Sequence, residues 1–293
     1  MKPFLDFRVL LALGLTIFFW ASAFAGIRAA LEYYSPAHIA LLRFLVASVV
    51  LTLYAVGSRM RLPELRDLPA VVVCGFLAFT VYHVALNYGE ITVSAGSASL
   101  LVNTAPIFTA FFAATFLGER VGVLVWTGMG VSFLGAVLIS FGEGENFSLD
   151  PGAPFVLLSA ISSAAYFVIS KPYLRKYTAL EFTTYAIWAG TVLTLVFLPG
   201  LPAQIGAAPV RATLTSVYLG LFPTAVAYIA YAYVLSRMPA SRTASFLYLV
   251  PGVALLVAWA WLGEVSPALS LIGGVIALAG VLLVNRRPRP REG

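Results

Sequence analysis

Long apolar segments separated by short polar breaks follow one another along almost the whole chain. Each segment has about 20 residues, the length of α-helix that crosses roughly 30 Å of hydrocarbon. Backbone polar groups in a bilayer must bond to one another, so such segments fold as helices. The pattern predicts ten spanning helices, at about 9–31, 36–56, 69–88, 94–116, 122–141, 154–171, 180–198, 212–235, 242–262 and 267–285.

One stretch of the first half recurs in the second half. Residues 106–138 align without a gap on residues 251–283, and helix-breaking residues coincide in the two copies. The alignment pairs nine identical residues: Pro106, Ala113, Leu117, Gly118, Glu119, Leu124, Gly128, Gly135 and Leu138. We interpret this as two five-helix repeats, 1–141 and 142–293, that together form one domain.

The composition agrees with a lipid environment. Hydrophobic residues make up 61% of the chain and charged residues 10%, too few to cover the core of a soluble protein. The first apolar segment is too long for a signal-peptide core, so we expect it to remain as a spanning helix. Cys74 is the only cysteine, which excludes an intramolecular disulfide.

The net charge of +6 is distributed asymmetrically, which argues against nucleic acid as a partner. If the N-terminus is cytoplasmic, 15 Lys and Arg residues lie on that side, against Arg28 and Arg211 outside and Arg43 within a span. This bias is the positive-inside rule, and it predicts that both termini are cytoplasmic. The cytoplasmic set is Lys2, Arg8, Arg59, Arg61, Arg66, Arg120, Lys171, Arg175, Lys176, Arg237, Arg242, Arg286, Arg287, Arg289 and Arg291.

The repeat and the topology together indicate a class of function. Because each repeat has an odd number of helices, the second repeat must enter the membrane with the opposite orientation. Inverted repeats are a common plan of secondary transporters, whose substrate site lies between the repeats near the middle of the membrane. We therefore expect an all-α integral membrane protein that works by alternating access.

Particular residues also resemble those of a known family. Residues 20–24 read Trp-Ala-Ser-Ala-Phe, Arg43 precedes Phe44, and each half ends in a Leu-Gly-Glu turn followed by two spaced glycines. This pattern resembles the EamA domains of the drug/metabolite transporter superfamily over nearly the whole chain. The resemblance implies a bacterial inner-membrane protein that exports aromatic and other neutral amino acids. Export of hydrophobic drugs or other metabolites is the alternative.

Aromatic and polar residues in both halves are candidates for the substrate cavity. Such side chains hold flat groups by stacking and ammonium groups by cation–π attraction. Phe79, Tyr82 and His83 share one helical face, and offsets of 145 or 146 relate Trp20, His83 and Asn103 to tyrosines. The predicted substrate-binding residues are Trp20, Phe79, Tyr82, His83, Asn103, Tyr166, Tyr228 and Tyr248. Helix packing remains an alternative role for Trp20, and a structural hydrogen bond remains one for His83.

Other singled-out residues are expected to shape the helices. Pro106 and Pro251 remove a backbone donor in matched helices, so we predict hinges there. Gly128 and Gly273 allow close helix packing, within the chain or in a dimer. Glu119 and Glu264 suit the positive N-terminal end of a helix.

Arg43 is the one basic residue placed inside a span. We assign it a structural role, in which it reaches outward or binds carbonyl groups at a helix end. Contact with a substrate carboxylate is the alternative.

The absence of certain groups from the sequence bears on mechanism. Every Asp and Glu lies at the end of a predicted span or in a loop, so we expect facilitated diffusion, with His83 as the only group suited to carry a proton. No catalytic or nucleotide-binding motif is present, so we expect no enzyme activity, cofactor or metal. The expected partners are a neutral amino acid and the bilayer, for a monomer or homodimer, and a passive channel is a further alternative.

Overall fold

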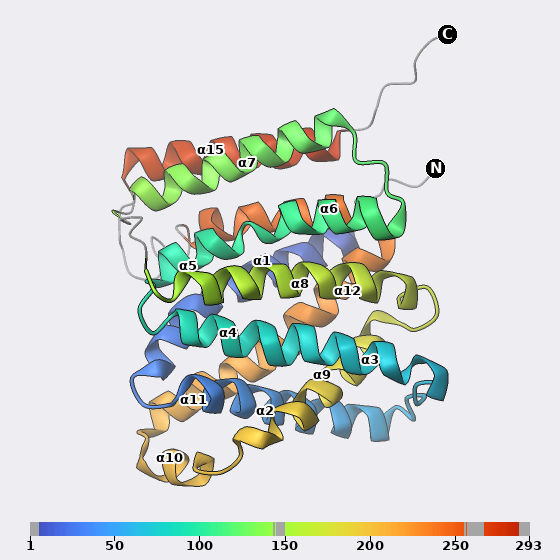
Figure 1. Ribbon diagram of the computed structural model, residues 1–293, viewed down its shortest axis with the longest axis vertical. Coiled ribbons are helices and arrows are strands. Elements are labelled where there is room, and N and C mark those ends of the chain that lie inside the picture. Colours follow the sequence, from blue (N-terminus) through green and yellow to red (C-terminus); the bar gives the residue numbers. More distant parts are fainter. Residues whose placement is uncertain (1–5, 143, 145–149, 255, 257–266, 287–293) are drawn as a thin grey trace.

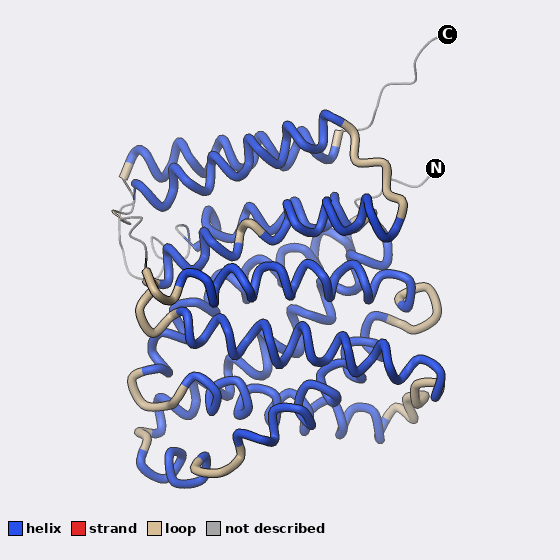
Figure 2. Tube along the Cα trace, viewed as in Figure 1, coloured by secondary structure: helices blue, strands red, loops and turns tan. Residues whose placement is uncertain are grey.

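The computed structural model describes residues 6–142, 144, 150–254, 256 and 267–286. These residues form helices and loops, with no strand among them (Figure 2). The α-helices of the first half are α1 (Phe7–Leu31), α2 (Pro36–Gly57), α3 (Leu68–Gly75), α4 (Tyr82–Gly89), α5 (Ala95–Val102), α6 (Ala105–Leu117) and α7 (Val123–Gly142). Those of the second half are α8 (Ala153–Tyr173), α9 (Ala179–Thr194), α10 (Leu201–Ala207), α11 (Val210–Leu219), α12 (Ala227–Arg237), α13 (Ala240–Ser245) and α15 (Ala268–Asn285).

Nine of the ten predicted spans are confirmed as helical stretches that are long and apolar enough to cross a membrane, within the described residues. The other, 242–262, is described only in part, as α13, the 3₁₀ turn η5 (Phe246–Leu249) and helical residues 250–254. Glu264, one of the predicted structural residues, lies outside the described residues. Short α10, in the break after the seventh span, was not predicted.

The sequence explains where several helices begin and end. The Asp6 carboxylate accepts from the backbone N of Val9 at 2.9 Å, and the Ser35 hydroxyl caps α2 immediately before Pro36. Side-chain oxygens at these positions satisfy donors that the first helical turn leaves free. Gly118 ends α6 with a φ of 64°, a conformation that glycine adopts without strain.

The pair α7 and α15 shows how the halves are related. A Cβ on Gly128 would lie 2.9 Å from the carbonyl oxygen of Gly280, and one on Gly135 would lie 2.6 Å from that of Gly273. Contacts that advance along α7 therefore recede along α15, so these matched helices are antiparallel. The small-residue face predicted on each is filled by the other helix of the same chain (Figure 1).

Both halves carry the same irregularity in their third span. A π-helical segment separates α3 from α4 (η2, Phe76–Val81) and another separates α11 from α12 (η4, Gly220–Val226). A glycine at the start of each segment permits a close approach. A Cβ on Gly75, just before η2, would lie 2.7 Å from Ala186 O, and one on Gly220, the first residue of η4, would lie 2.6 Å from Arg43 O. The third span of each half thus packs tightly on the second span of the other.

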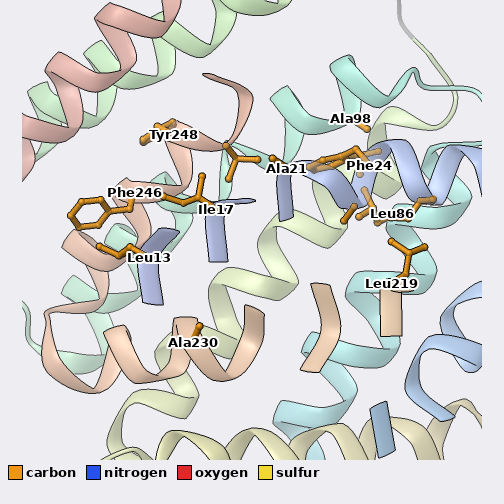
Figure 3. Packing of buried hydrophobic residues seen from close by; sticks show 14 of the residues in the cluster. Leu13, Ile17, Ala21, Phe24, Leu86, Ala98, Leu219, Ala230, Phe246 and Tyr248 are labelled. Atoms are coloured by element: carbon orange, nitrogen blue, oxygen red, sulfur yellow. The ribbon is translucent and has the colours of Figure 1, made fainter. Parts of the chain in front are cut away.

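The first helix of each half also packs against the third span of the other half, α1 against α12 and α8 against α4. Much of the hydrophobic core lies along α1 (Figure 3). Leu13 and Ile17 lie near Phe246, while Phe24 lies toward Leu86 and Leu219. This arrangement places the interface of the two halves at the centre of the bundle.

The two ends of the bundle differ in the turns they carry. The turns from α1 to α2 and from α4 to α5 lie at one end, which we call the Glu90 end (left in Figure 1). The turns from α6 to α7 and from α8 to α9 lie at the other, which we call the Glu119 end.

Candidate functional site

A central cavity lies between the two halves. Its empty volume, open solvent included, is about 660 Å³. Of the predicted substrate-binding residues, Trp20, Tyr82, His83, Asn103 and Tyr228 line this cavity. Its other lining residues include Phe24, Ile27, Arg43, Leu86, Phe167 and Leu247.

The aromatic rings in and beside the cavity form one contact network, in which Phe79 and Tyr166 are buried but do not line the cavity. Tyr228 lies at the middle, with its ring centroid 5.1 Å from that of Trp20, 4.9 Å from Phe79 and 5.9 Å from His83. The Phe79 and Tyr166 rings are 6.1 Å apart. These separations are typical of packed aromatic pairs. The network is therefore a preformed wall built from both halves.

The π-helical segments offer carbonyl groups that side chains occupy. Trp20 Nε1 donates to the carbonyl of Pro223 at 3.0 Å. Because Pro223 has no N–H, the carbonyl four residues earlier, on Leu219, lacks its usual helical donor. The Thr224 hydroxyl donates to that carbonyl at 2.8 Å. The broken helix thus fixes both Trp20 and Thr224.

His83 is held in the same way in the first half. Its Nδ1 lies 2.9 Å from the carbonyl oxygen of Ala78, which is part of η2. If Nδ1 carries the proton and donates, Nε2 is the unprotonated nitrogen. The ring is buried between Phe44 and Tyr82, with centroids 4.9 and 4.8 Å away. This is the structural hydrogen bond considered above, made by a residue that also lines the cavity.

Asn103 occupies a break in the fourth span. It ends α5, and its Nδ2 donates to Ser99 O at 2.8 Å. A new helix, α6, then begins at Ala105 with Pro106 in its first turn. Before Pro251, η5 interrupts the matched span. Both predicted proline sites thus follow helix irregularities, while their role as hinges remains a prediction.

Tyr248 lies apart from the other candidates. It is buried, but it is absent from the cavity lining, and its nearest recorded ring contact is Phe133 at 6.5 Å. Its neighbour Leu247 lines the cavity instead. The offset of 145 predicted the correct helix but could not predict which side chain faces inward, because η5 changes the helical period.

The expectation that the Arg43 side chain extends toward the membrane surface is wrong. It is 2% exposed and lines the central cavity. Its Nε donates to the Thr224 hydroxyl at 3.3 Å, while Nη1 has no hydrogen-bond partner in the described part of the chain. A helix-end carbonyl is not among its recorded partners.

Glu90, in the break between the third and fourth predicted spans, is a buried carboxyl group. It directly follows α4, yet it is 0% exposed, and neither carboxylate oxygen has a hydrogen-bond partner among the described residues. Arg28 Nη1 donates to its backbone carbonyl at 2.6 Å. Gly89 explains the burial, since a Cβ there would lie 3.0 Å from Gly152 O at the start of α8. The one sign of this burial in the sequence was a glycine, Gly89, directly before an acidic residue at the end of a span.

A second, outer cavity lies at the Glu90 end, one helical turn beyond the central one. On α1, Ile27 lines the central cavity and Leu31 the outer one; on α4, Leu86 lines the central cavity, and Glu90, just beyond that helix, lines the outer one. Arg28 and Glu32 complete its charged lining. The contact between Arg28 and Glu90 therefore lies where a molecule would leave the central cavity toward this end.

Glu119 closes the opposite end. Its carboxylate accepts from the backbone N of Ala240 at 2.6 Å and from the N and Oγ of Ser241 at 3.1 and 2.8 Å. The carboxylate was expected at the start of a helix, and it lies at the start of α13, in the other half. Lys171 Nζ also donates to the carbonyls of Leu235 and Met238. The Glu119 bonds join the two halves at this end, whereas the Lys171 bonds lie within the second half.

Comparison with known proteins gives the family. The model of the EamA-like transporter family matches twice, at residues 7–141 and 150–286. The chain is 48% identical to the "Uncharacterized transporter YdfC" of Bacillus subtilis over 94% of this chain and 90% of that protein. It is 44% identical to a "Probable terminal-alkyne amino-acid exporter" of Streptantibioticus cattleyicolor, over 96% and 94%.

A solved structure shares the fold. It is titled "Crystal structure of protein", and it superposes with a TM-score of 0.76 at 17% identity, covering 94% of this chain and 96% of that one. Two family matches, an all-helical bundle and antiparallel matched helices agree with the predicted fold and with a transporter rather than an enzyme. The chain belongs to the EamA-like transporter family of multi-pass membrane transporters.

Proposed function

We propose that this protein exports neutral amino acids, aromatic ones included, across the bacterial inner membrane. The observation that carries the proposal is the central cavity, whose wall combines the rings of Trp20, Tyr82 and Tyr228 with few polar groups. Aromatic faces suit flat or apolar side chains and can hold an ammonium group. The relative named as an amino-acid exporter supports this substrate class.

We further propose that transport proceeds by alternating access. The cavity takes its wall from both halves. Different contacts lie at its two ends, Arg28 with Glu90 within the first half and Glu119 with α13 between the halves. In this proposal residues 1–141 and 142–293 act as one transport domain, as a monomer or a homodimer. The positive-inside bias supports a cytoplasmic Glu119 end and cytoplasmic termini.

The proposed energetics are facilitated diffusion down the substrate gradient. No Asp or Glu lines the central cavity among the described residues. Glu90 lines the outer cavity instead. An imposed pH gradient, without a substrate gradient, is therefore expected to drive no net uptake into proteoliposomes. Net uptake driven by that gradient alone would contradict this part of the proposal.

Uptake of labelled phenylalanine, threonine, methionine and lysine into proteoliposomes tests the substrate class. We expect saturable uptake of the three neutral amino acids, with mutual competition and little uptake of lysine. Trp20→Ala and His83→Ala are expected to raise the KM for phenylalanine by at least about tenfold, since each loses ring contacts of roughly 0.5–1.5 kcal/mol and side-chain packing besides.

Tyr248→Phe is the matched control, because Tyr248 is buried outside the cavity lining. It is expected to keep the parent KM. Absence of uptake of all four amino acids by well-inserted protein would refute the substrate class. It would favour drugs or other metabolites as substrates.

A further inference from the structure

Arg43 is an unusual group to find in the wall of this cavity. Its guanidinium carries a fixed positive charge and five N–H donors. Thr224 Oγ1 accepts from Nε at 3.3 Å, and the same hydroxyl donates to Leu219 O at 2.8 Å. The Thr224 hydroxyl thus uses its proton in the bond to Leu219 O, and its oxygen accepts the bond from Arg43. This arrangement fixes the side chain by one edge.

One nitrogen of the guanidinium has no partner among the described residues. Nη1 is buried without a hydrogen-bond partner in the described part of the chain, although the residue is 2% exposed. Burial of an unpaired charged donor is costly, and a purely structural arginine would be expected to use its donors on carbonyls or carboxylates. The unused donor is therefore available to a ligand.

The surroundings of Arg43 contain little negative charge to neutralise it. The cavity walls near it are the side chains of Tyr82, His83 and Tyr228. Glu90 makes no hydrogen bond to Arg43, since neither of its carboxylate oxygens has a hydrogen-bond partner in the described residues. Glu90 also lines the outer cavity, not the central one. The central cavity thus has a positive group with an open position.

We propose that Arg43 binds the carboxylate of the transported molecule, and that a free carboxylate is a requirement for transport. The inference rests on the proposed function only in taking the central cavity as the substrate site. An arginine fork matches a carboxylate with two parallel hydrogen bonds, and such bonds are stronger than those between neutral groups. The aromatic wall then receives the apolar side chain. Amides, esters and amines of the same shape are excluded.

Paired ligands test the proposal on the unaltered protein. Phenylalanine is compared with phenylalaninamide, and 3-phenylpropanoate with 3-phenylpropanamide, by their stabilisation of the purified protein against heat in detergent. We expect each acid to bind at least about tenfold more tightly than its amide, because the amide cannot accept two charge-assisted bonds from Arg43. Equal binding of acid and amide by the parent would overturn the proposal.

Variants then assign the preference to Arg43. Arg43→Gln is expected to lose the preference for acid over amide, while Arg43→Lys retains part of it as a point charge without the fork. Thr224→Val removes the partner of Nε and is expected to reduce the preference as well. Arg211→Gln is the matched control, since Arg211 is exposed and lines neither cavity. A well-folded Arg43→Gln that keeps the full preference would overturn the assignment.

The two ligand pairs separate this inference from the proposed function. Binding of 3-phenylpropanoate that depends on Arg43, without binding of phenylalanine, would refute amino-acid transport and support the carboxylate site. Binding of phenylalanine and its amide with equal affinity would refute the carboxylate site and support an amino-acid site. Binding of none of the four ligands would refute both.

Discussion

At the scale of single residues, Trp20 joins the two halves through one hydrogen bond. Its Nε1 donates to Pro223 O, within a helical segment that already lacks one backbone donor. Trp20→Phe keeps an aromatic ring but removes this hydrogen bond, at a cost of about 0.5–1.5 kcal/mol. We expect a lower melting temperature in detergent and weaker binding of phenylalanine.

The control for Trp20 is Trp126→Phe. Trp126 is 39% exposed on α7, and its side chain makes no hydrogen bond or ring contact with another described residue. A similar loss of stability in both variants would show that the bond to Pro223 O contributes nothing specific.

Glu90 gives stability a dependence on pH. Burial raises the pKa of its carboxyl well above the ordinary value of 4.5, while Arg43 and Arg28 act in the opposite direction. A raised pKa means that folding favours the protonated form. The stabilisation from this group is therefore complete below about pH 4.5 and is lost as pH rises through the raised pKa.

Glu90→Gln imitates the protonated carboxyl. We expect its melting temperature to exceed that of the parent once pH has risen through the raised pKa, and to approach it in acid. Glu32→Gln, at an exposed residue of the same outer cavity, is expected to keep the parent profile. Parallel curves for Glu90→Gln and the parent would contradict the account of Glu90.

At the scale of helices, the pair α7 and α15 depends on glycine. In lipid, helices associate through close packing, so a methyl group at the contact is poorly tolerated. A Cβ on Gly135 would lie 2.6 Å from Gly273 O, whereas one on Gly130 meets nothing within 4 Å. We expect Gly135→Ala to destabilise the protein by about 1–3 kcal/mol.

Gly130→Ala on the same helix is the matched control. It is expected to be neutral or to stabilise by about 0.5–1 kcal/mol, because alanine is the better helix former. Equal effects of the two substitutions on thermal unfolding would argue against the antiparallel glycine contact.

The contact of Glu119 with α13 is predicted to hold one end closed. Glu119→Gln removes the charge from three hydrogen bonds between the halves, which is expected to weaken this capping contact by about 0.5–2 kcal/mol. The Glu119 end should then open more often. Ser236→Cys, in the pocket beside Glu119, reports this opening by its rate of reaction with a membrane-impermeant maleimide.

Cys74 is buried and so gives little background in that experiment. We expect faster labelling of Ser236→Cys when Glu119→Gln is added. An unchanged rate would mean that the carboxylate does not control access at this end.

At the scale of the whole molecule, the sequence was sufficient to predict most of the fold. Spans follow from apolar length, and the relation of the halves follows from the repeat of Gly128 and Gly135 at Gly273 and Gly280. The π-helical segments could not be predicted, because no local pattern distinguishes them from regular helix. Pro223 was the one visible sign, within η4.

The candidate site was predicted less completely than the fold. Helical faces and the offset of 145 brought Trp20, His83 and Tyr228 to one cavity. The burial of Glu90 was not predicted, because it depends on the approach of α8 to Gly89, a contact between residues far apart in the sequence. The sequence left two roles open for Arg43, and it could not predict the bond from Nε to Thr224, because Thr224 lies far away in the sequence.

The central claim is that two inverted halves carry a substrate by alternating access. Proteoliposomes loaded with unlabelled phenylalanine test it most directly, through the initial uptake of labelled phenylalanine compared with that of empty vesicles. The account predicts saturable uptake that is accelerated several-fold by the internal load, since a loaded carrier returns faster. Uptake that rises linearly with concentration and is the same in loaded and empty vesicles would identify a passive channel and contradict alternating access.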